Sequence, residues 1–246
     1  MKKLVYKYIH ITKTYYHNYK ARKKFDNDLT TFKSKSDSRF SINNEDNFPC
    51  LNDNTNNTGF DAHYVYHPAW ATRIIKDINP SKHIDISSTL HFCSQLSAYV
   101  PVDFYDYRPA NLTLPNLKTL KGDLMNLDFS DNSVESISCM HTVEHIGLGR
   151  YGDPIDPIGD LKAIEELKRV VAKGGSLLFV VPVGKARIQF NAHRIYSFEM
   201  ILSCFEGFEL KNFSLITDLG DFIWNANPEI ISNQKYGCGC FWLIKS

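Results

Sequence analysis

Apolar and polar positions along residues 62–246 alternate between the two periods that distinguish strands from helices. Short apolar runs typical of strands occur at residues 83–86, 102–106, 117–122, 134–140, 176–181, 208–215 and 240–244. Segments with apolar residues three or four positions apart lie between several of these runs, as in amphipathic helices. This order predicts an α/β domain with a mostly parallel sheet of seven strands. The run Leu177–Val181 is apolar throughout, as a central strand covered on both faces requires.

Three sequence signals set the expected limits of the helices. Pro68, at a plausible first helical position, and Asn79-Pro80 predict a helix between them. Asp160 is expected to cap the helix that follows it. Gly174-Gly175 is expected to end that helix before the central strand begins.

Two segments of different composition precede the α/β domain. Residues 1–29 form a basic, tyrosine-rich arm, with eight Lys or Arg and no acid up to Lys24. Apolar or aromatic residues recur there at helical spacing, which is compatible with a helix that has one semi-apolar face. They are Leu4, Tyr8, Ile11, Tyr15 and Tyr19. Residues 30–61 are rich in Ser, Asn and Asp, and we expect a linker or long loop because so polar a stretch buries little apolar surface.

The arm has two interpretations that the sequence leaves open. Its charge and tyrosines fit contact with an anionic membrane surface or a phosphorylated partner. A solvated helix packed on the domain or on another subunit fits them equally well. The first interpretation implies a peripheral location at the inner face of the membrane.

Charge and hydropathy narrow the class of protein further. The chain has 28 Lys plus Arg and 27 Asp plus Glu, a formal charge of +1 that argues against a generally basic nucleic-acid binder. Beyond Lys24 the balance is acidic, with 20 cationic and 27 acidic residues. No apolar run is long enough for a spanning helix, and Lys7 interrupts any early signal-peptide core, so we expect a soluble, cytoplasmic protein.

The six cysteines do not suggest a disulfide framework, because they are spread through a chain too long to need one. Cys238-Gly-Cys240 raises a metal question, but a CxC pair without a second pair is a weak signal. Two strand residues flanking a glycine are the favoured interpretation, and no metal is expected.

Charged and polar residues follow the predicted strands at the edge where ligands bind in doubly wound sheets. Asp85 and Asp106 end the first two strands, and Asp123 follows the third. An acid at the end of the second strand is the position that holds the ribose hydroxyls of a nucleotide cofactor. Glu144-His145 follows the fourth strand, and His193-Arg194 lies in the loop after the fifth.

Five motifs follow one another in order at these strand ends. They are His83-Ile-Asp85-Ile-Ser-Ser, Asp106, Gly122-Asp123-Leu-Met-Asn-Leu-Asp-Phe, Cys139-Met-His141-Thr-Val-Glu144-His145, and Lys173-Gly174-Gly175 before the strand at 177–181. Over residues 74–183 they resemble the class I S-adenosylmethionine-dependent methyltransferases. The resemblance implies a doubly wound Rossmann-like methyltransferase fold, S-adenosylmethionine as cofactor, and methyl transfer as the reaction.

Within that superfamily the chain is most similar to an uncharacterised subgroup associated with bacterial surface-polysaccharide gene clusters. This similarity implies O-methylation of a sugar or sugar nucleotide in surface-glycan synthesis. The chain departs from the superfamily in its first loop, which is normally glycine-rich and here reads Ser87-Ser88-Thr89. Hydroxyl side chains there either narrow the site or bind the cofactor's carboxylate in place of bare amides.

The resemblance also implies roles for individual residues. Asp106 would hold the ribose, Asp123 with Leu124 the adenine, and Asp85 with Ser87 the methionine end. His141 follows the fourth strand beside the same site and is a further cofactor-binding candidate.

A general base would help if the acceptor is a sugar hydroxyl, and three histidines are candidates: His145, His141 and His193. Arg194 is positioned to hold a phosphate or carboxylate of the substrate. Asp153, in the proline-flanked loop 149–157, is a candidate substrate or ion contact, with a turn role as its alternative. His141 and His145, four residues apart, also fit a metal pair on a helix, although no third ligand lies nearby in sequence.

Three functions therefore remain as hypotheses. The first is an S-adenosylmethionine-dependent O-methyltransferase. The second is a degenerate, non-catalytic nucleotide-binding module in a glycan-assembly complex, tethered by the basic arm. The third, a nicotinamide-dependent enzyme, is disfavoured because its dinucleotide loop also needs glycines.

The membrane interpretation of the arm gives a direct test. Each Lys or Arg near an anionic surface contributes about 1 kcal/mol of attraction, so eight of them give strong, salt-sensitive binding. We expect the full chain to float with anionic liposomes at low salt, and the chain lacking residues 1–24 to stay at the bottom of the gradient. Equal flotation of both proteins would contradict the membrane interpretation.

Overall fold

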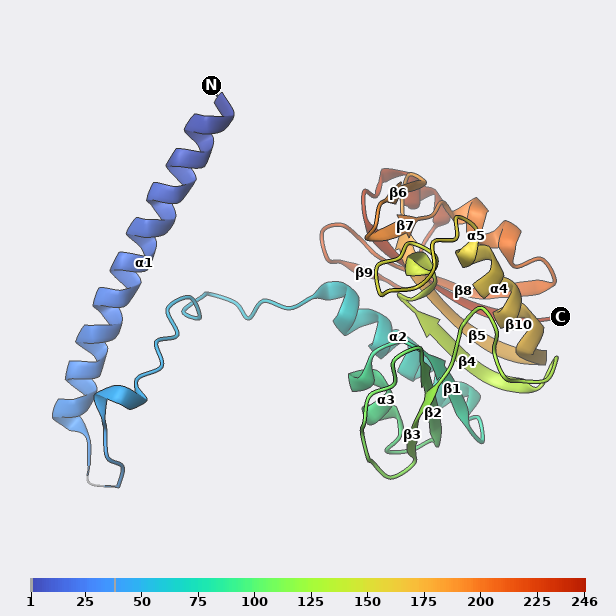
Figure 1. The fold of residues 1–246 in the computed structure, drawn as a ribbon, viewed down its shortest axis with the longest axis horizontal. Coiled ribbons are helices and arrows are strands. Elements are labelled where there is room, and N and C mark those ends of the chain that lie inside the picture. The colour runs from blue at the N-terminus through green and yellow to red at the C-terminus, as the bar shows by residue number, and fades with distance from the viewer. Residues whose placement is uncertain (1, 38) are drawn as a thin grey trace. The chain divides into compact units, whose positions relative to one another are not determined.

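The computed structural model describes the backbone of residues 2–37 and 39–246 and the side chains of residues 14–37 and 39–246 (Figure 1). The chain divides into two compact units, residues 1–59 and residues 60–246. None of the described helices is both long and apolar enough to cross a bilayer.

The first unit consists of helix α1 (Lys2–Lys35) and a short 3-10 turn η1 (Asn44–Asp46). Helix α1 continues past the expected end of the arm at residue 29 and includes the first residues of the expected linker. Ion pairs Arg22–Asp26 and Lys24–Asp28, each four residues apart, support this continuation. Tyr15, Tyr16 and Tyr19 are exposed, whereas Leu4, Tyr8 and Ile11 lie outside the described side chains.

The second unit is built on an eight-stranded sheet. Its strands are β1 (His83–Ile86), β2 (Val102–Asp106), β3 (Leu117–Lys121), β4 (Val134–Met140), β5 (Val171–Val183), β8 (Phe208–Ile216), β9 (Phe222–Ile223) and β10 (Gly237–Lys245). They lie in the order β3-β2-β1-β4-β5-β10-β8-β9. The first five are parallel neighbours, and β10 pairs antiparallel with both β5 and β8. The doubly wound, mostly parallel sheet is as predicted, and the two-residue β9 adds one strand to the expected seven.

Smaller elements complete this unit. A separate hairpin is formed by β6 (Arg187–Gln189) and β7 (His193–Ile195), and 3-10 turns are η2 (Val143–His145) and η3 (Pro228–Asn233). The helices are α2 (Ala62–Ile78), α3 (Leu90–Leu96), α4 (Gly159–Val170) and α5 (Phe198–Cys204).

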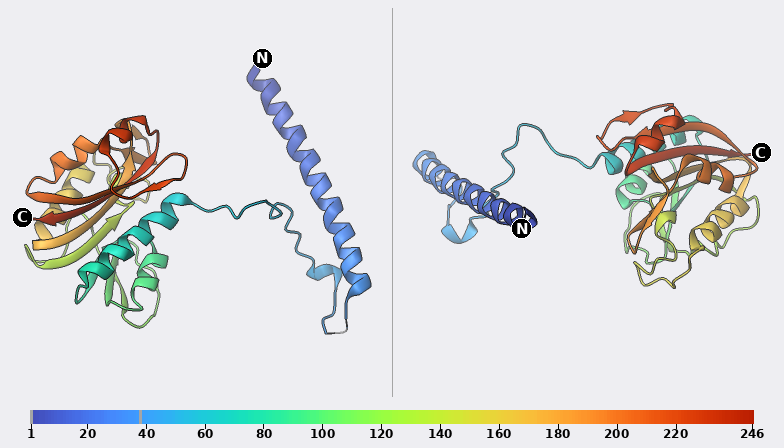
Figure 2. Two further views of the ribbon diagram at one scale, coloured as in Figure 1. Left: turned by 180° about the vertical axis from the view of Figure 1, so that it is seen from behind. Right: turned by 90° about the horizontal axis from the view of Figure 1, so that it is seen from above.

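Helices cover both faces of the sheet (Figures 1 and 2). On one face α2 and α3 pack with Leu178 and Val180 of β5. On the other face α4 and α5 pack with Leu177 and Phe179 of the same strand. Successive side chains of a strand point to opposite faces, so a strand that is buried on both faces must be apolar throughout. The run at 177–181 meets this requirement.

Two of the expected helix ends are wrong. Helix α2 begins six residues before Pro68, because Asp61 caps it by accepting a hydrogen bond from the Tyr64 amide at 3.2 Å, and Pro68 lies within the helix. Asp160 lies in the first turn of α4 but makes no cap; its carboxylate instead accepts from the Tyr196 hydroxyl at 2.9 Å.

The Gly174-Gly175 pair lies inside β5 and does not end α4, which stops at Val170. The pairing of β4 with β5 shifts register here, between Val134 and Ser136. Gly174 has φ of +73°, and a Cβ on Gly175 would lie only 2.8 Å from the Ala172 carbonyl oxygen. The glycines therefore permit an irregularity within the central strand.

Helix α4 offers a matched pair for testing this packing. Ile164 is 1% exposed against the sheet, and Leu161 on the same helix is 45% exposed. Ile164→Ala leaves a cavity and is expected to lower the free energy of unfolding by about 2–5 kcal/mol, as measured by urea denaturation. Leu161→Ala is expected to change it by less than about 1 kcal/mol. Similar losses for the two variants would mean that α4 does not pack as described.

Candidate functional site

Residues at the carboxyl ends of β2 and β3 line a cavity of about 350 Å³, here called the strand-end cleft. Asp106, Asp123 and the buried Leu124 lie along it, together with Ser87 from the loop after β1. The cleft lies beside the point where the strand order reverses between β1 and β4, which is where doubly wound sheets bind ligands. It brings together most of the residues that the sequence assigns to a cofactor.

A second cavity of about 430 Å³, here called the histidine cavity, adjoins the first. It is lined by residues from α2, the first loop, the segment after β4, and the segments containing β7 and Tyr236. They are Tyr64, Ser87, Ser88, Thr89, Met140, His141, Glu144, His145, Arg150, Tyr151, Ala192, His193 and Tyr236. Ser87, His141, His145 and Tyr151 line both cavities. The candidate site is therefore a two-part space whose halves meet at the histidines after β4.

The two acids of the strand-end cleft are held by backbone donors of their own loops. Asp106, at the end of β2, is half-buried, and its Oδ1 accepts from the Arg108 amide at 2.7 Å. Asp123 is exposed, and its Oδ1 accepts from the Met125 amide at 2.9 Å. These contacts fix the direction of each carboxylate. A carboxylate oriented in this way can accept from both hydroxyls of a ribose.

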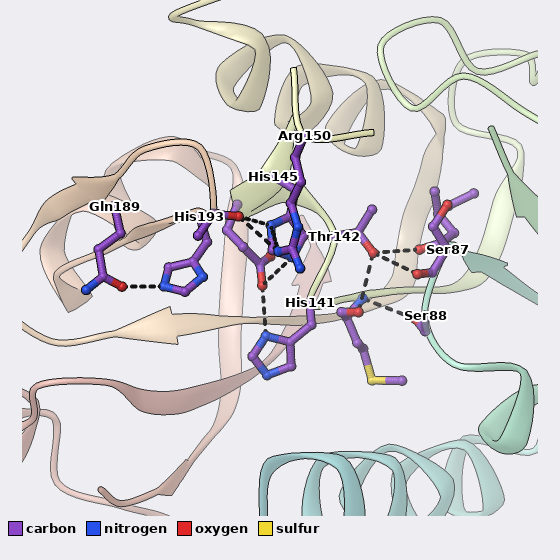
Figure 3. Close-up of polar contacts among 12 residues, drawn as sticks. Ser87, Ser88, His141, Thr142, His145, Arg150, Gln189 and His193 are labelled. Carbon is purple, nitrogen blue, oxygen red and sulfur yellow. Dashed lines mark hydrogen bonds and ion pairs between the residues drawn. The ribbon is translucent and has the colours of Figure 1, made fainter. Parts of the chain in front are cut away.

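The first loop turns in the manner of a glycine without containing one. Ser87 has φ of +53°, in the left-handed region that glycine favours. Its amide donates to the Tyr105 carbonyl oxygen at 2.8 Å, and the Thr142 hydroxyl donates to its own carbonyl oxygen at 3.0 Å (Figure 3). Contacts from β2 and from the segment after β4 therefore hold the tight turn that a glycine would make.

Asp85 lines neither cavity, so the structure does not bring it to the cleft with the other predicted cofactor residues. It is fully buried; its Oδ1 accepts from the Ser88 amide at 3.0 Å and its Oδ2 from the Ser138 hydroxyl. Burial raises the pKa of Asp85 to about 6, although the hydrogen bonds from Ser138 and Ser88 oppose the rise. The residue organises the first loop from behind.

The three predicted catalytic histidines lie in one neighbourhood and differ in their partners (Figure 3). Nδ1 of His145 donates to the Ala192 carbonyl oxygen at 2.6 Å, which leaves Nε2 with the lone pair of the neutral ring. Nε2 of His193 donates to Oε1 of Gln189 at 2.6 Å. Burial, followed by the nearby His145, lowers the pKa of His193.

His141 is the most enclosed of the three histidines. It is 8% exposed and has a φ of +56°. Its Nδ1 lies 2.8 Å from Oε1 of Glu144, which is 1% exposed. Among the described side chains, neither Nε2 of His141 nor Oε2 of Glu144 has a hydrogen-bond partner.

The two predicted substrate residues serve the loop that encloses the site. Asp153 reaches the strand-end cleft, but its carboxylate accepts from the amides of Gly147 at 2.8 Å and Tyr151 at 3.2 Å. Burial acts to raise its pKa, and these backbone donors outweigh that effect and lower it. Arg194 is 5% exposed, lines neither cavity, and donates to the Ile146 carbonyl oxygen at 2.6 Å.

Arg150 occupies the position that the sequence assigned to Arg194. It lines the histidine cavity and lies over the Tyr151 ring at 5.0 Å, as Arg108 also does. Tyr64 and Tyr236, which the sequence did not single out, complete the aromatic wall of the cavity. Arg150 and Tyr151 stand in the loop 149–157 that the sequence marked as a lid or crossover connection. Tyr64 and Tyr236 carry no comparable signal, because only the folded sheet brings them to the site.

Comparisons with known proteins agree with this fold. A family described as "Caenorhabditis protein of unknown function, DUF268" matches residues 124–218. No curated protein matches the chain in sequence.

Solved structures show the same architecture. The MccD protein is 14% identical with a TM-score of 0.52, over 72% of this chain and 96% of that one. The [4+2]-cyclase SpnF is 13% identical with a TM-score of 0.52, over 77% and 84%. A TehB-like SAM-dependent methyltransferase from Corynebacterium glutamicum is 18% identical with a TM-score of 0.49, over 74% and 89%.

The likeness to the first two structures confirms the doubly wound Rossmann-like fold that the motifs predicted. One of them is a cyclase, so the fold by itself does not define the reaction. The reaction has to be argued from the residues of the site.

The buried carboxyl of Asp85 predicts a distinct dependence of stability on pH. Its folded-state pKa of about 6 lies above the ordinary value of 3.8, so the folded state binds this proton more tightly than the unfolded state. The resulting stabilisation is complete below the ordinary value and is lost as the pH rises through about 6. Asp85→Asn removes the buried charge, and its gain in unfolding free energy over the wild type is expected to be up to about 3 kcal/mol larger at pH ~8 than at pH ~4.5.

Urea denaturation at the two pH values measures this difference. Asp128→Asn, a change at an exposed carboxyl, is the control and is expected to alter the unfolding free energy by less than about 0.5 kcal/mol at both. A gain for Asp85→Asn that does not vary with pH would contradict the assignment.

Proposed function

We propose that this protein is an S-adenosylmethionine-dependent methyltransferase that methylates an oxygen of a sugar or sugar nucleotide. One observation carries the proposal: a cleft lined by strand-end acids and a cavity lined by histidines meet at Ser87, His141, His145 and Tyr151. Methyl transfer needs two ligands held end to end, and this is a space of that form. The ordered motifs at the strand ends support the same reaction.

The residues of the strand-end cleft suit the proposed cofactor. The carboxylate of Asp106, held by the Arg108 amide, would accept from the ribose hydroxyls. Asp123 and Leu124 lie where the adenine would bind, one polar and one apolar. Ser87, with its left-handed backbone, provides the close turn that the methionine end requires. When bound, the cofactor supplies a methyl group on a sulfonium, and alignment contributes much of the rate because this leaving group is already good.

His145 is the favoured general base. Its Nδ1 is fixed by Ala192, so Nε2 is available to accept the proton of an acceptor hydroxyl as the oxygen attacks. It also lines both cavities, as a residue at the point of transfer should. His193 lines only the histidine cavity and contacts the Tyr236 ring at 4.8 Å, which favours a role in holding the acceptor.

The lining of the histidine cavity supports an acceptor that carries sugar and phosphate groups. Tyr64, Tyr151 and Tyr236 provide aromatic faces, against which the apolar faces of sugar rings can pack. Arg150 adds a planar cation of the kind that binds phosphate in two contacts. A nucleotide-linked sugar has both features. A place in surface-glycan synthesis rests on the subgroup resemblance alone.

The basic arm is proposed to bring the enzyme to an anionic membrane surface. The tyrosines Tyr15, Tyr16 and Tyr19 of α1 are exposed, and basic residues continue to Lys35 at the end of the helix. Such a helix combines charge attraction with aromatic insertion at the interface.

Calorimetric titration with S-adenosylhomocysteine tests the proposed function. We expect the wild type to bind, and Asp106→Ala to weaken binding at least about tenfold, because two hydrogen bonds to a charged acceptor are lost. Asp128→Ala is the matched control: Asp128 is an exposed acid of the same region that does not line the strand-end cleft, so its variant should bind as the wild type does. No binding by the wild type at millimolar ligand would overturn the proposal and favour the non-catalytic module.

A further inference from the structure

Three metal-ligating side chains from distant parts of the chain meet behind the wall of the histidine cavity. They are His63 of α2, His141 after β4 and Cys238 of β10, and one ligand atom of each lies within 4.8 Å of the other two. Cys238 is fully buried, His141 nearly so, and His63 is half-buried. We propose that these three residues bind one divalent transition-metal ion, with zinc as the favoured metal.

The donor set determines the kind of metal. Two imidazole nitrogens and one thiolate suit zinc, which binds such ligands in a tetrahedron, and exclude magnesium and calcium, which prefer oxygen. Metal–ligand bonds of about 2.0–2.3 Å place tetrahedral ligand atoms about 3.3–3.7 Å apart. The observed spacing of up to 4.8 Å therefore needs a contraction of about 1 Å, which is within the range of small side-chain rotations.

The contact between His141 and Glu144 provides independent support. Nδ1 of His141 lies 2.8 Å from Oε1 of the buried Glu144. A carboxylate in this position fixes the ring so that Nε2 carries the lone pair, which is the arrangement found behind metal-bound histidines. Nε2 of His141 is buried and has no hydrogen-bond partner among the described residues. A buried polar atom without a partner is costly, and a metal ion would supply the missing partner.

The residues around the three ligands fit a cation. Oε2 of Glu144 also lacks a partner among the described groups, and it adds negative charge beside the proposed ion. The rings of His63 and His141 stack at 5.6 Å, and His63 stacks at 5.4 Å on Tyr236 at the cavity wall. Burial, followed by the nearby His141, lowers the pKa of His63 to about 4, so its ring is neutral near pH 7. Metals bind the neutral form of histidine.

The place of the ion gives it access to the cavity. His141 lines both cavities, and Tyr236 lines the histidine cavity, so the ion would lie at the wall of the site. Three protein ligands leave a fourth position for water or for an oxygen of a bound molecule. His145 is not a ligand in this arrangement, because its Nδ1 is held by Ala192. The pairing of His141 with His145 weighed from the sequence is thus replaced by His141 with His63 and Cys238, where no metal had been expected.

Metal binding can be measured directly on the untagged full chain, whatever reaction the protein catalyses. After removal of bound metal by a chelator and dialysis, one equivalent of Co²⁺ is expected to bind and to give the charge-transfer absorption of a cobalt–thiolate bond. Zn²⁺ is expected to displace it stoichiometrically. Elemental analysis of protein exposed to Zn²⁺ should then give one ion per chain.

Variants identify the ligands. Cys238→Ser and His63→Gln are expected to weaken Zn²⁺ binding at least about hundredfold, and Glu144→Gln, at the positioning residue, about 10–100-fold. Cys240→Ser is the matched control, since Cys240 is a second fully buried thiol on the same strand and should leave the affinity unchanged. Far-ultraviolet circular dichroism of each variant separates loss of binding from loss of folding, and Cys238→Ala gives a second test of the thiol if Cys238→Ser does not fold.

Two results would overturn the proposal. One is wild-type protein that binds no stoichiometric Co²⁺ or Zn²⁺ when the metal is in excess over the protein. The other is folded Cys238→Ser protein with the affinity and cobalt–thiolate absorption of the wild type, which would place the metal elsewhere in the chain. The proposed methyl-transfer function would be unaffected by either result, because its test is cofactor binding.

Discussion

The hydrogen bonds of the buried Asp85 carboxylate fix the conformation on which the rest of the site depends. They join the end of β1, the first loop and β4 at one point, through the Ser88 amide and the Ser138 hydroxyl. Held in this way, Ser87 keeps a left-handed turn that a side chain would otherwise disfavour. The opening of the strand-end cleft and the direction of the segment after β4 both follow from this junction. A carboxyl with a raised pKa is the energetic cost of the arrangement.

The sequence predicted the cofactor side of the site better than the acceptor side, and the reason is geometric. Asp106 and Asp123 follow parallel strands directly, so the direction of each strand determines where these residues lie. Arg194 and Asp153 belong to a hairpin and a loop whose paths depend on tertiary contacts. Arg194 is consequently drawn under the loop by backbone carbonyl groups, and Arg150 lies at the cavity. Asp85 was placed on the correct strand, but sequence position does not reveal that the loop covers it.

The fold was predictable because apolar periodicity and strand-end motifs agree over most of residues 62–246. Helix limits were less so: Asp61 overrides the signal of Pro68, and β5 begins before the glycine pair that was expected to precede it. The cluster of His63, His141 and Cys238 has no local sequence signature. Its members lie on α2, after β4 and on β10, and meet because β10 lies next to β5 and α2 packs on the same face of the sheet.

The position of β10 between β5 and β8 has a consequence for how the protein matures. Until β10 is synthesised and inserted, β5 and β8 each expose an unpaired edge of the kind that promotes association between chains. Such long-range pairing is slow, so a newly made chain passes through a stage at risk of aggregation. Cys238 reaches His63 and His141 only when that stage ends, and the cluster therefore distinguishes finished molecules from unfinished ones.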